Sequence, residues 1–150
     1  MRRCTINSRQ AAVLLAAAIV LWFAAAGAAQ NQERYKVRLT TVPMDGGMRN
    51  TVAGSGSATA ALTGTTLAIT GTFEGLRSPA TAATLNSGAA RGVRGASIAE
   101  LTVSKATKGT LTGSINLTAE QAKGLREGRM YIELASEKAP EGNLWGWLLK

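Results

Sequence analysis

The chain has no histidine, a single cysteine and a single aspartate, Asp45, among its 150 residues. Without histidine it lacks the commonest general base, the usual serine and cysteine triads and most transition-metal sites. One aspartate cannot supply an Asp-rich calcium loop. We therefore expect no cofactor and no metal site, and we expect an apolar core rather than disulfides to stabilise the fold.

The first 29 residues have the layout of a secretory signal peptide. Three arginines precede an uninterrupted apolar run from Ala11 to Phe23, and small residues follow that run. Cleavage after Ala28 or Ala29 would remove the cysteine and leave one domain at 30–150. A retained membrane anchor is the alternative, because 11–29 is just long enough to span a bilayer, although its alanine content favours removal. We predict export to the periplasm or the medium, with membrane contact only through this segment before cleavage.

The charge that remains after cleavage is moderately basic. Without the three signal arginines, 14 of the 17 basic side chains remain against nine acidic ones, which leaves a net charge of +5. Basic charge favours anionic partners. Because the acidic residues interrupt the basic ones and the chain is predicted to be exported, nucleic acid is a poor candidate. We expect the partner to be an envelope or extracellular protein or a glycan.

Alternating apolar and polar residues predict an all-β domain with antiparallel strands. The expected strands cover about 33–42, 53–62, 66–73, a short piece within 74–96, 99–103 with 111–117 as a hairpin, and a last hairpin around the turn at 136–143. One short helix near 119–127 is predicted by the spacing of Thr118 and Gln121, typical of a capping box, and by Gly128 after it. Seven or eight short strands of this kind form a sandwich or a barrel.

The first strand carries a basic row, Arg34, Lys36 and Arg38, on the face opposite Tyr35 and its apolar neighbours. Charge of this kind commonly keeps a protein soluble and protects an edge strand from pairing. The functional alternative is a polyanion-binding strip. No aromatic residues interleave with the row, as base stacking would require.

Three glutamates, Glu133, Glu137 and Glu141, gather in the last hairpin. A hydrolase that works with paired carboxylates needs two acids in one cleft. The simpler interpretation is solvated hairpin charge balanced by Lys138. A small glycan or small-molecule hydrolase that uses these glutamates is therefore our second hypothesis, and a carboxyl with a perturbed pKa in a cleft would favour it.

A series of landmarks resembles the chordin-type domain, abbreviated CHRD. In order they are "YKVRLTTVP", "GTFEGLRSPATAATLNSGAARGVRG", "GTLTGSINLTAEQAKGLREGRMYIELAS" and "APEGNLWGWL", which together cover about Tyr35 to Leu149. The resemblance implies an antiparallel, Greek-key-like β-sandwich and an extracytoplasmic setting, and it implies no enzyme. We predict a non-catalytic binding or structural module of unknown ligand.

The chain departs from this family at three positions. Where relatives commonly carry histidine, it has Thr84, Asn86 and Ala135. If these histidines form one polar or metal-binding site in relatives, that site has been lost as a unit here, because a partial ligand set left buried would be costly. The resemblance therefore implies no metal site in this chain.

The C-terminal strand concentrates aromatic residues in a chain that has few of them. Alternation places Trp145 and Trp147 on one face, and Tyr131 lies in the preceding strand. Either a loop or the helix covers these rings as a satellite core, or they form a platform for sugar rings or a partner protein. We predict that the two indoles lie side by side, partly buried, with one edge in solvent. Trp145, Trp147, Tyr131 and the basic row are thus the candidate binding residues.

Overall fold

The computed structural model describes residues 31–150, so the predicted signal peptide and its cleavage site lie outside the described residues. One short α-helix and eight strands make up this part of the chain. None of its helices is both long enough and apolar enough to cross a membrane. The elements in order are β1 (Gln32–Thr41), the 3-10 helix η2 (Met48–Asn50), β2 (Ser55–Thr63), β3 (Thr66–Glu74), β4 (Ala80–Ser87), β5 (Ala96–Val103), β6 (Gly109–Asn116), α2 (Ala119–Arg126), β7 (Met130–Ser136) and β8 (Ala139–Trp147).

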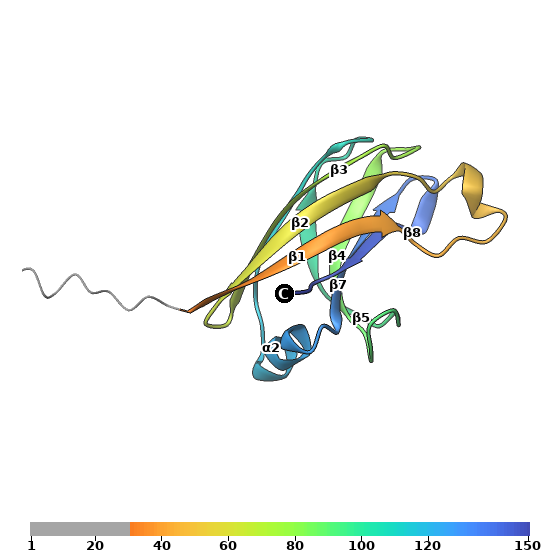
Figure 1. The fold of residues 1–150 in the computed structure, drawn as a ribbon. Helices are drawn as coiled ribbons and strands as arrows, with labels where there is room; N and C mark the ends of the chain where they lie inside the picture. The colour runs from red at the N-terminus through yellow and green to blue at the C-terminus, as the bar shows by residue number, and fades with distance from the viewer. Residues whose placement is uncertain (1–30) are drawn as a thin grey trace, which may run out of the picture. The chain divides into compact units, whose positions relative to one another are not determined.

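The strands close into a barrel in the order β1-β2-β3-β6-β5-β4-β7-β8, with every described pair antiparallel (Figure 1). The prediction of an all-β fold with about eight strands and one helix is confirmed, but the predicted sandwich is wrong. Two short seams close the barrel. β5 pairs with β6 at Thr102 and Val103, and β1 pairs with β8 at Thr40 and Thr41. Because each seam involves so few residues, the alternation along the strands could not distinguish two stacked sheets from one closed sheet.

The inward face of each strand supplies the core. Tyr35, Val37 and Leu39 of β1 are each no more than 2% exposed, and they meet buried residues from every other strand and from α2. Alternation with period two therefore specifies correctly which β1 residues are buried. β3 and β4 are not neighbours in the sheet, and their connection crosses β6 and β5, as in a Greek key.

The helix begins and ends as its sequence predicts. Thr118 Oγ1 accepts a hydrogen bond from the Gln121 amide at 3.2 Å, and Gln121 Oε1 accepts one from the Thr118 amide at 2.9 Å. Gly128 follows the helix with φ +70°, a conformation that favours glycine. Leu125 is buried in the core, so α2 covers one end of the barrel (Figure 1).

Three segments differ from the sequence-based expectation. The central piece of 74–96 is an eight-residue strand, β4, that pairs with β5 and β7. The expected hairpin of β5 and β6 pairs at only two positions. The last turn is shorter than expected, because β8 already begins at Ala139 and includes Pro140 and Gly142. In each case the tertiary pairing of strands, rather than local propensity, sets the boundary.

Candidate functional site

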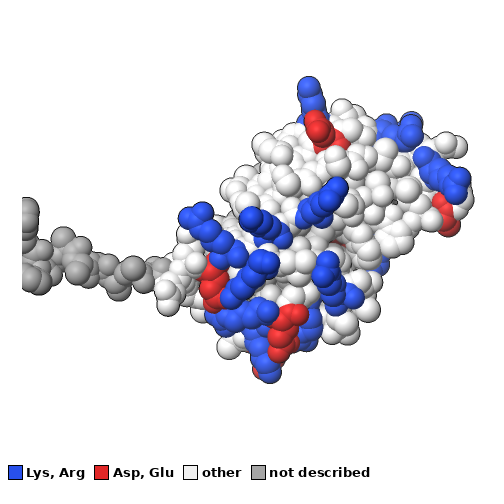
Figure 2. Space-filling model, viewed as in Figure 1, with Lys and Arg blue, Asp and Glu red and all other residues white. Residues whose placement is uncertain are grey.

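The basic row of β1 points outward along its whole length. Arg34, Lys36 and Arg38 are exposed, whereas the residues between them are buried. In cross-strand register they lie opposite Ala61, Thr59 and Ser57 of β2, none of which carries charge. Figure 2 shows basic side chains gathered along β1 and around α2, with uncharged surface beside them over β2 and β3. The three basic side chains thus form a line of positive charge on β1, next to an uncharged surface on β2.

β1 is not an edge strand, and the edge-protection interpretation of the basic row is therefore wrong. It pairs with β2 over eight positions and with β8 at Thr40 and Thr41. Lys36 adds two backbone hydrogen bonds to Leu149, of 2.7 and 3.1 Å. A strand with partners on both sides needs no charge to prevent pairing with another chain.

The aromatic residues form a cluster on the outer face of β7 and β8. The rings of Trp145 and Trp147 have centroids 6.1 Å apart, and the Tyr131 ring lies 4.6 Å from that of Trp147. Both indoles are partly buried and side by side, as predicted. Tyr131 is only 1% exposed, so it supports the indoles and is not itself available to a ligand in this structure.

The connection between β4 and β5 covers this cluster. The Gly95 amide donates a hydrogen bond to the Tyr131 hydroxyl at 3.1 Å, and the Arg94 guanidinium lies 6.0 Å from the centre of the Trp145 ring. Gly88 approaches Trp147 so closely that an added Cβ would lie 3.2 Å from its Cη2 atom. The indoles therefore form the satellite core that was one of the two interpretations of the sequence.

The three positions at which the family resemblance implies histidine also come together on this face. Thr84 and Asn86 lie on β4, and Ala135 lies opposite Ala82 of the same strand. The Asn86 amide donates to Thr84 Oγ1 at 3.0 Å. Thr84 and Ala135 line one small hollow of about 230 Å³ together with Glu133 and Glu141. The three positions thus bring together a hydroxyl, an amide and a methyl group, and none of them carries an imidazole.

Glu133, in the last hairpin, has a perturbed pKa. Burial raises the pKa of its carboxyl above the ordinary value, the Arg94 guanidinium opposes this, and Glu141 adds to it. The ion pair between Arg94 Nη1 and Glu133 Oε1 measures 3.0 Å. Arg94 Nη1 also donates to the Glu141 carbonyl at 2.8 Å, which attaches the β4–β5 connection to the last hairpin. Glu137 is exposed and does not line this hollow.

Sequence reasoning missed a polar cluster at the α2 end of the barrel. The Glu33 carboxylate forms ion pairs with Arg126 at 2.7 Å and with Lys150 at 2.8 Å. It also accepts a hydrogen bond from the Tyr35 hydroxyl at 2.8 Å. Arg126 first, and then Lys150, lower the pKa of Glu33 to about 2, and burial raises the pKa of Tyr35 to about 12. Glu33 and Arg126 are 93 positions apart, so no local pattern could indicate their contact.

Among residues 31–150, no three His, Cys, Asp or Glu side chains are grouped closely enough to hold a metal ion. In comparisons with known proteins, no curated protein and no solved structure matches the chain. The family model described as CHRD domain matches residues 35–148, which is most of the chain and nearly all of the barrel. The chain therefore belongs to the CHRD domain family.

Proposed function

We propose that this protein is a non-catalytic, extracytoplasmic binding module and that the basic row of β1 is its contact surface. CHRD domains are modules of extracellular type and are generally non-catalytic, which supports both parts of the role. The expected partner is an envelope or extracellular protein or a glycan. Nucleic acid is not expected, and neither is a membrane beyond the signal segment.

The observation that carries the proposal is that the row has no acidic partner. Arg94, Arg126, Arg129 and Lys150 each form an ion pair with a glutamate, at 2.6 to 3.0 Å. Among the described residues no carboxylate pairs with Arg34, Lys36 or Arg38, and the only polar side-chain contact of these three is Arg34 Nε to Gln32 at 3.2 Å. Three neighbouring cations that repel one another favour an external anion.

Trp145 and Trp147 contribute less to ligand binding in this proposal than the basic row does. Their packing against Tyr131 and beneath Arg94 accounts for most of their surface, so a contribution to binding is limited to their exposed edges. A ligand that spans β1 and β8 would reach these edges from the row, because the register of β1 and β8 brings Arg38 next to Trp147.

Capture from an envelope extract tests the proposal. The purified protein should retain specific components that the triple variant R34Q/K36Q/R38Q does not retain. The matched control R49Q/R77Q/K108Q removes the same charge from exposed sites elsewhere on the barrel and should behave like wild type. Equal capture by both triple variants would contradict the assignment of the row as the contact surface.

The hydrolase alternative has one observation in its favour, the raised pKa of Glu133 beside Glu141. The Arg94 ion pair opposes it, because a guanidinium at 3.0 Å favours the charged carboxylate over the protonated acid that would donate a proton. Turnover of a glycan or ester substrate by wild type, abolished in Glu133→Gln, would support this alternative. Equal turnover by wild type and Glu133→Gln would contradict this alternative.

A further inference from the structure

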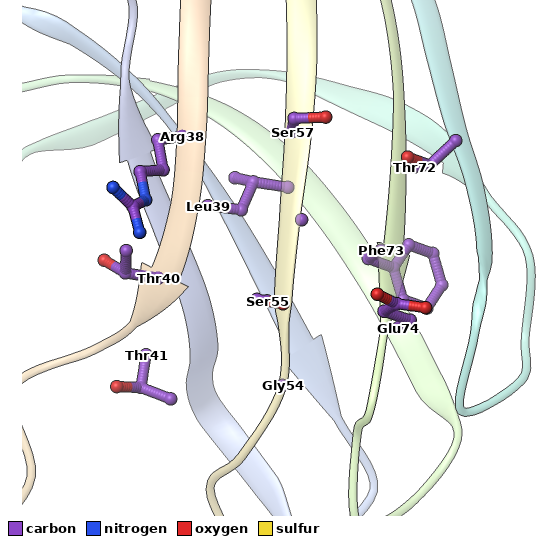
Figure 3. Close-up of a pocket in the computed structure, with 11 residues that line it drawn as sticks. Arg38, Leu39, Thr40, Thr41, Gly54, Ser55, Ser57, Thr72, Phe73 and Glu74 are labelled. Carbon is purple, nitrogen blue, oxygen red and sulfur yellow. The ribbon is translucent and has the colours of Figure 1, made fainter.

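A shallow groove runs along the outer surface of the barrel beside the basic row. Three adjoining hollows make it up, of about 320 Å³ beside Arg34 and Lys36, about 430 Å³ over β2, β3 and β6, and about 550 Å³ beside Arg38. Figure 3 shows the last of these, with Ser55 and Ser57 on β2 in its middle and Thr72 and Glu74 on β3 at its side. Shared lining residues, Ser57, Thr59, Thr70 and Thr72, join the hollows into one groove.

The basic row is the wall of this groove. Alternate residues on a strand are about 6.7 Å apart, so the three cations span roughly 13 Å in a line. Arg34 and Lys36 border the hollow of about 320 Å³. Arg38 borders the next hollow, although its guanidinium leans to the other side of β1 in Figure 3. A linear polyanion lying beside β1 would meet a positive charge at regular intervals.

The floor of the groove is made of small side chains with hydroxyl groups. Ser57, Thr59, Thr70 and Thr72 are all exposed, and cross-strand register pairs Thr59 with Thr70 and Ser57 with Thr72. The Thr59 and Thr70 hydroxyl oxygens are 3.3 Å apart. Each hydroxyl can donate and accept hydrogen bonds, and therefore suits a ligand that itself carries many hydroxyl groups.

The groove lacks the features that other polyanions or a protein partner would require. Its two aromatic residues, Tyr35 and Phe73, are 1% and 2% exposed and cannot stack on a base. Ala61 and Ala68 are its only apolar lining residues that are not buried, whereas the centre of a protein interface is rich in exposed aromatic side chains. The one carboxylate in the described lining, Glu74, lies beyond Arg38 at the end of the groove. It leaves the stretch beside Arg34 and Lys36 free of negative charge.

We infer that this groove binds a linear acidic polysaccharide, whose carboxylate or sulfate groups pair with the basic row and whose sugar hydroxyls meet the serines and threonines of the floor. The inference rests on the proposed function and names its ligand class. Arg34 and Lys36 contribute most of the charge contact, because both line the same hollow as Thr59 and Thr70. Arg38 contributes less.

Titration calorimetry with three polymers tests the inference. Polygalacturonate carries carboxylates on sugars, dextran carries sugars without charge, and polyglutamate carries carboxylates without sugars. The purified protein should bind polygalacturonate more tightly than polyglutamate and should not bind dextran. R34Q/K36Q/R38Q should weaken binding of polygalacturonate on the order of tenfold or more, since each exposed ion pair contributes up to about fivefold. R49Q/R77Q/K108Q should change it by less than about threefold, because distant charges are screened by salt.

A variant that leaves the charge unchanged tests the floor. Thr70→Tyr places a ring across the groove at an exposed strand position where aromatic residues are well tolerated. It should weaken polygalacturonate binding about as much as loss of the row, with an unchanged thermal midpoint. If Thr70→Tyr binds like wild type, or if polyglutamate binds as tightly as polygalacturonate, the polysaccharide groove is wrong. Capture from envelope extract that still depends on the row would then leave the proposed function standing.

Discussion

Replacement of Trp147 by alanine measures whether the outer aromatic cluster stabilises the fold. The Trp147 ring packs against Tyr131 at 4.6 Å and against Trp145 at 6.1 Å, beneath the backbone of Gly88. With one edge in solvent, the indole buries on the order of 150 Å² of largely apolar surface. At about 25 cal/mol per Å² this is worth roughly 4 kcal/mol, and residual burial in the unfolded chain reduces it to about 3 kcal/mol.

Trp147→Ala should therefore lower the free energy of unfolding by about 3 kcal/mol, which for a domain of this size corresponds to a fall in Tm on the order of 10 °C. Urea unfolding followed by circular dichroism measures the change directly. Val93→Ala is the matched control, since Val93 lies in the covering connection, is 48% exposed and should change stability by less than about 0.5 kcal/mol. Coincident midpoints for Trp147→Ala and wild type would refute this reasoning and would make the indoles a binding platform.

Four further results are expected. The depressed pKa of Glu33 means that its ion pairs stabilise the fold above pH 4.5 and that this contribution is lost as the pH falls towards about 2. Urea midpoints of wild type should therefore drop more steeply across that window than those of Glu33→Gln, and equal drops would contradict the role of Glu33. Gly146→Ala should cost about 1–3 kcal/mol, because its Cβ would lie 2.5 Å from the Arg38 carbonyl oxygen at the β1–β8 seam, and an unchanged midpoint would contradict the close approach of these strands. Mass spectrometry of the exported protein should find an N-terminus at Ala29 or Gln30, and intact Met1 would argue for a retained segment. Elemental analysis should find no stoichiometric copper or zinc, and a molar equivalent that survives dialysis would overturn that expectation.

The last hairpin illustrates how far the sequence indicated the candidate site. Alternation correctly predicted that Trp145 and Trp147 share a face and remain partly buried, because the side chains of a strand point alternately to its two sides. What covers that face could not be read from the sequence. The Arg94 contacts with Trp145, Glu133 and Glu141 join segments about 40 to 50 residues apart, and such contacts depend on the path of the chain in space.

The sequence by itself determined the first strand of the barrel and its helix. Period-two alternation specified the buried residues of β1 and the outward direction of its basic row, and the capping box with Gly128 determined both ends of α2. These features are local, since each depends on residues only a few positions apart.

The tertiary structure alone decided that the sheet closes. Closure depends on the β1–β8 and β5–β6 seams, whose few pairs join strands through long-range register rather than through local pattern. It also decided that β1 has two neighbours, that Glu33 meets Arg126 and Lys150, and that the hydroxyls of β2 and β3 lie beside the basic row. Each of these contacts joins residues that only the packing of the whole barrel brings together, because hydrophobic burial constrains which face of a strand turns inward but not which strand lies next to it.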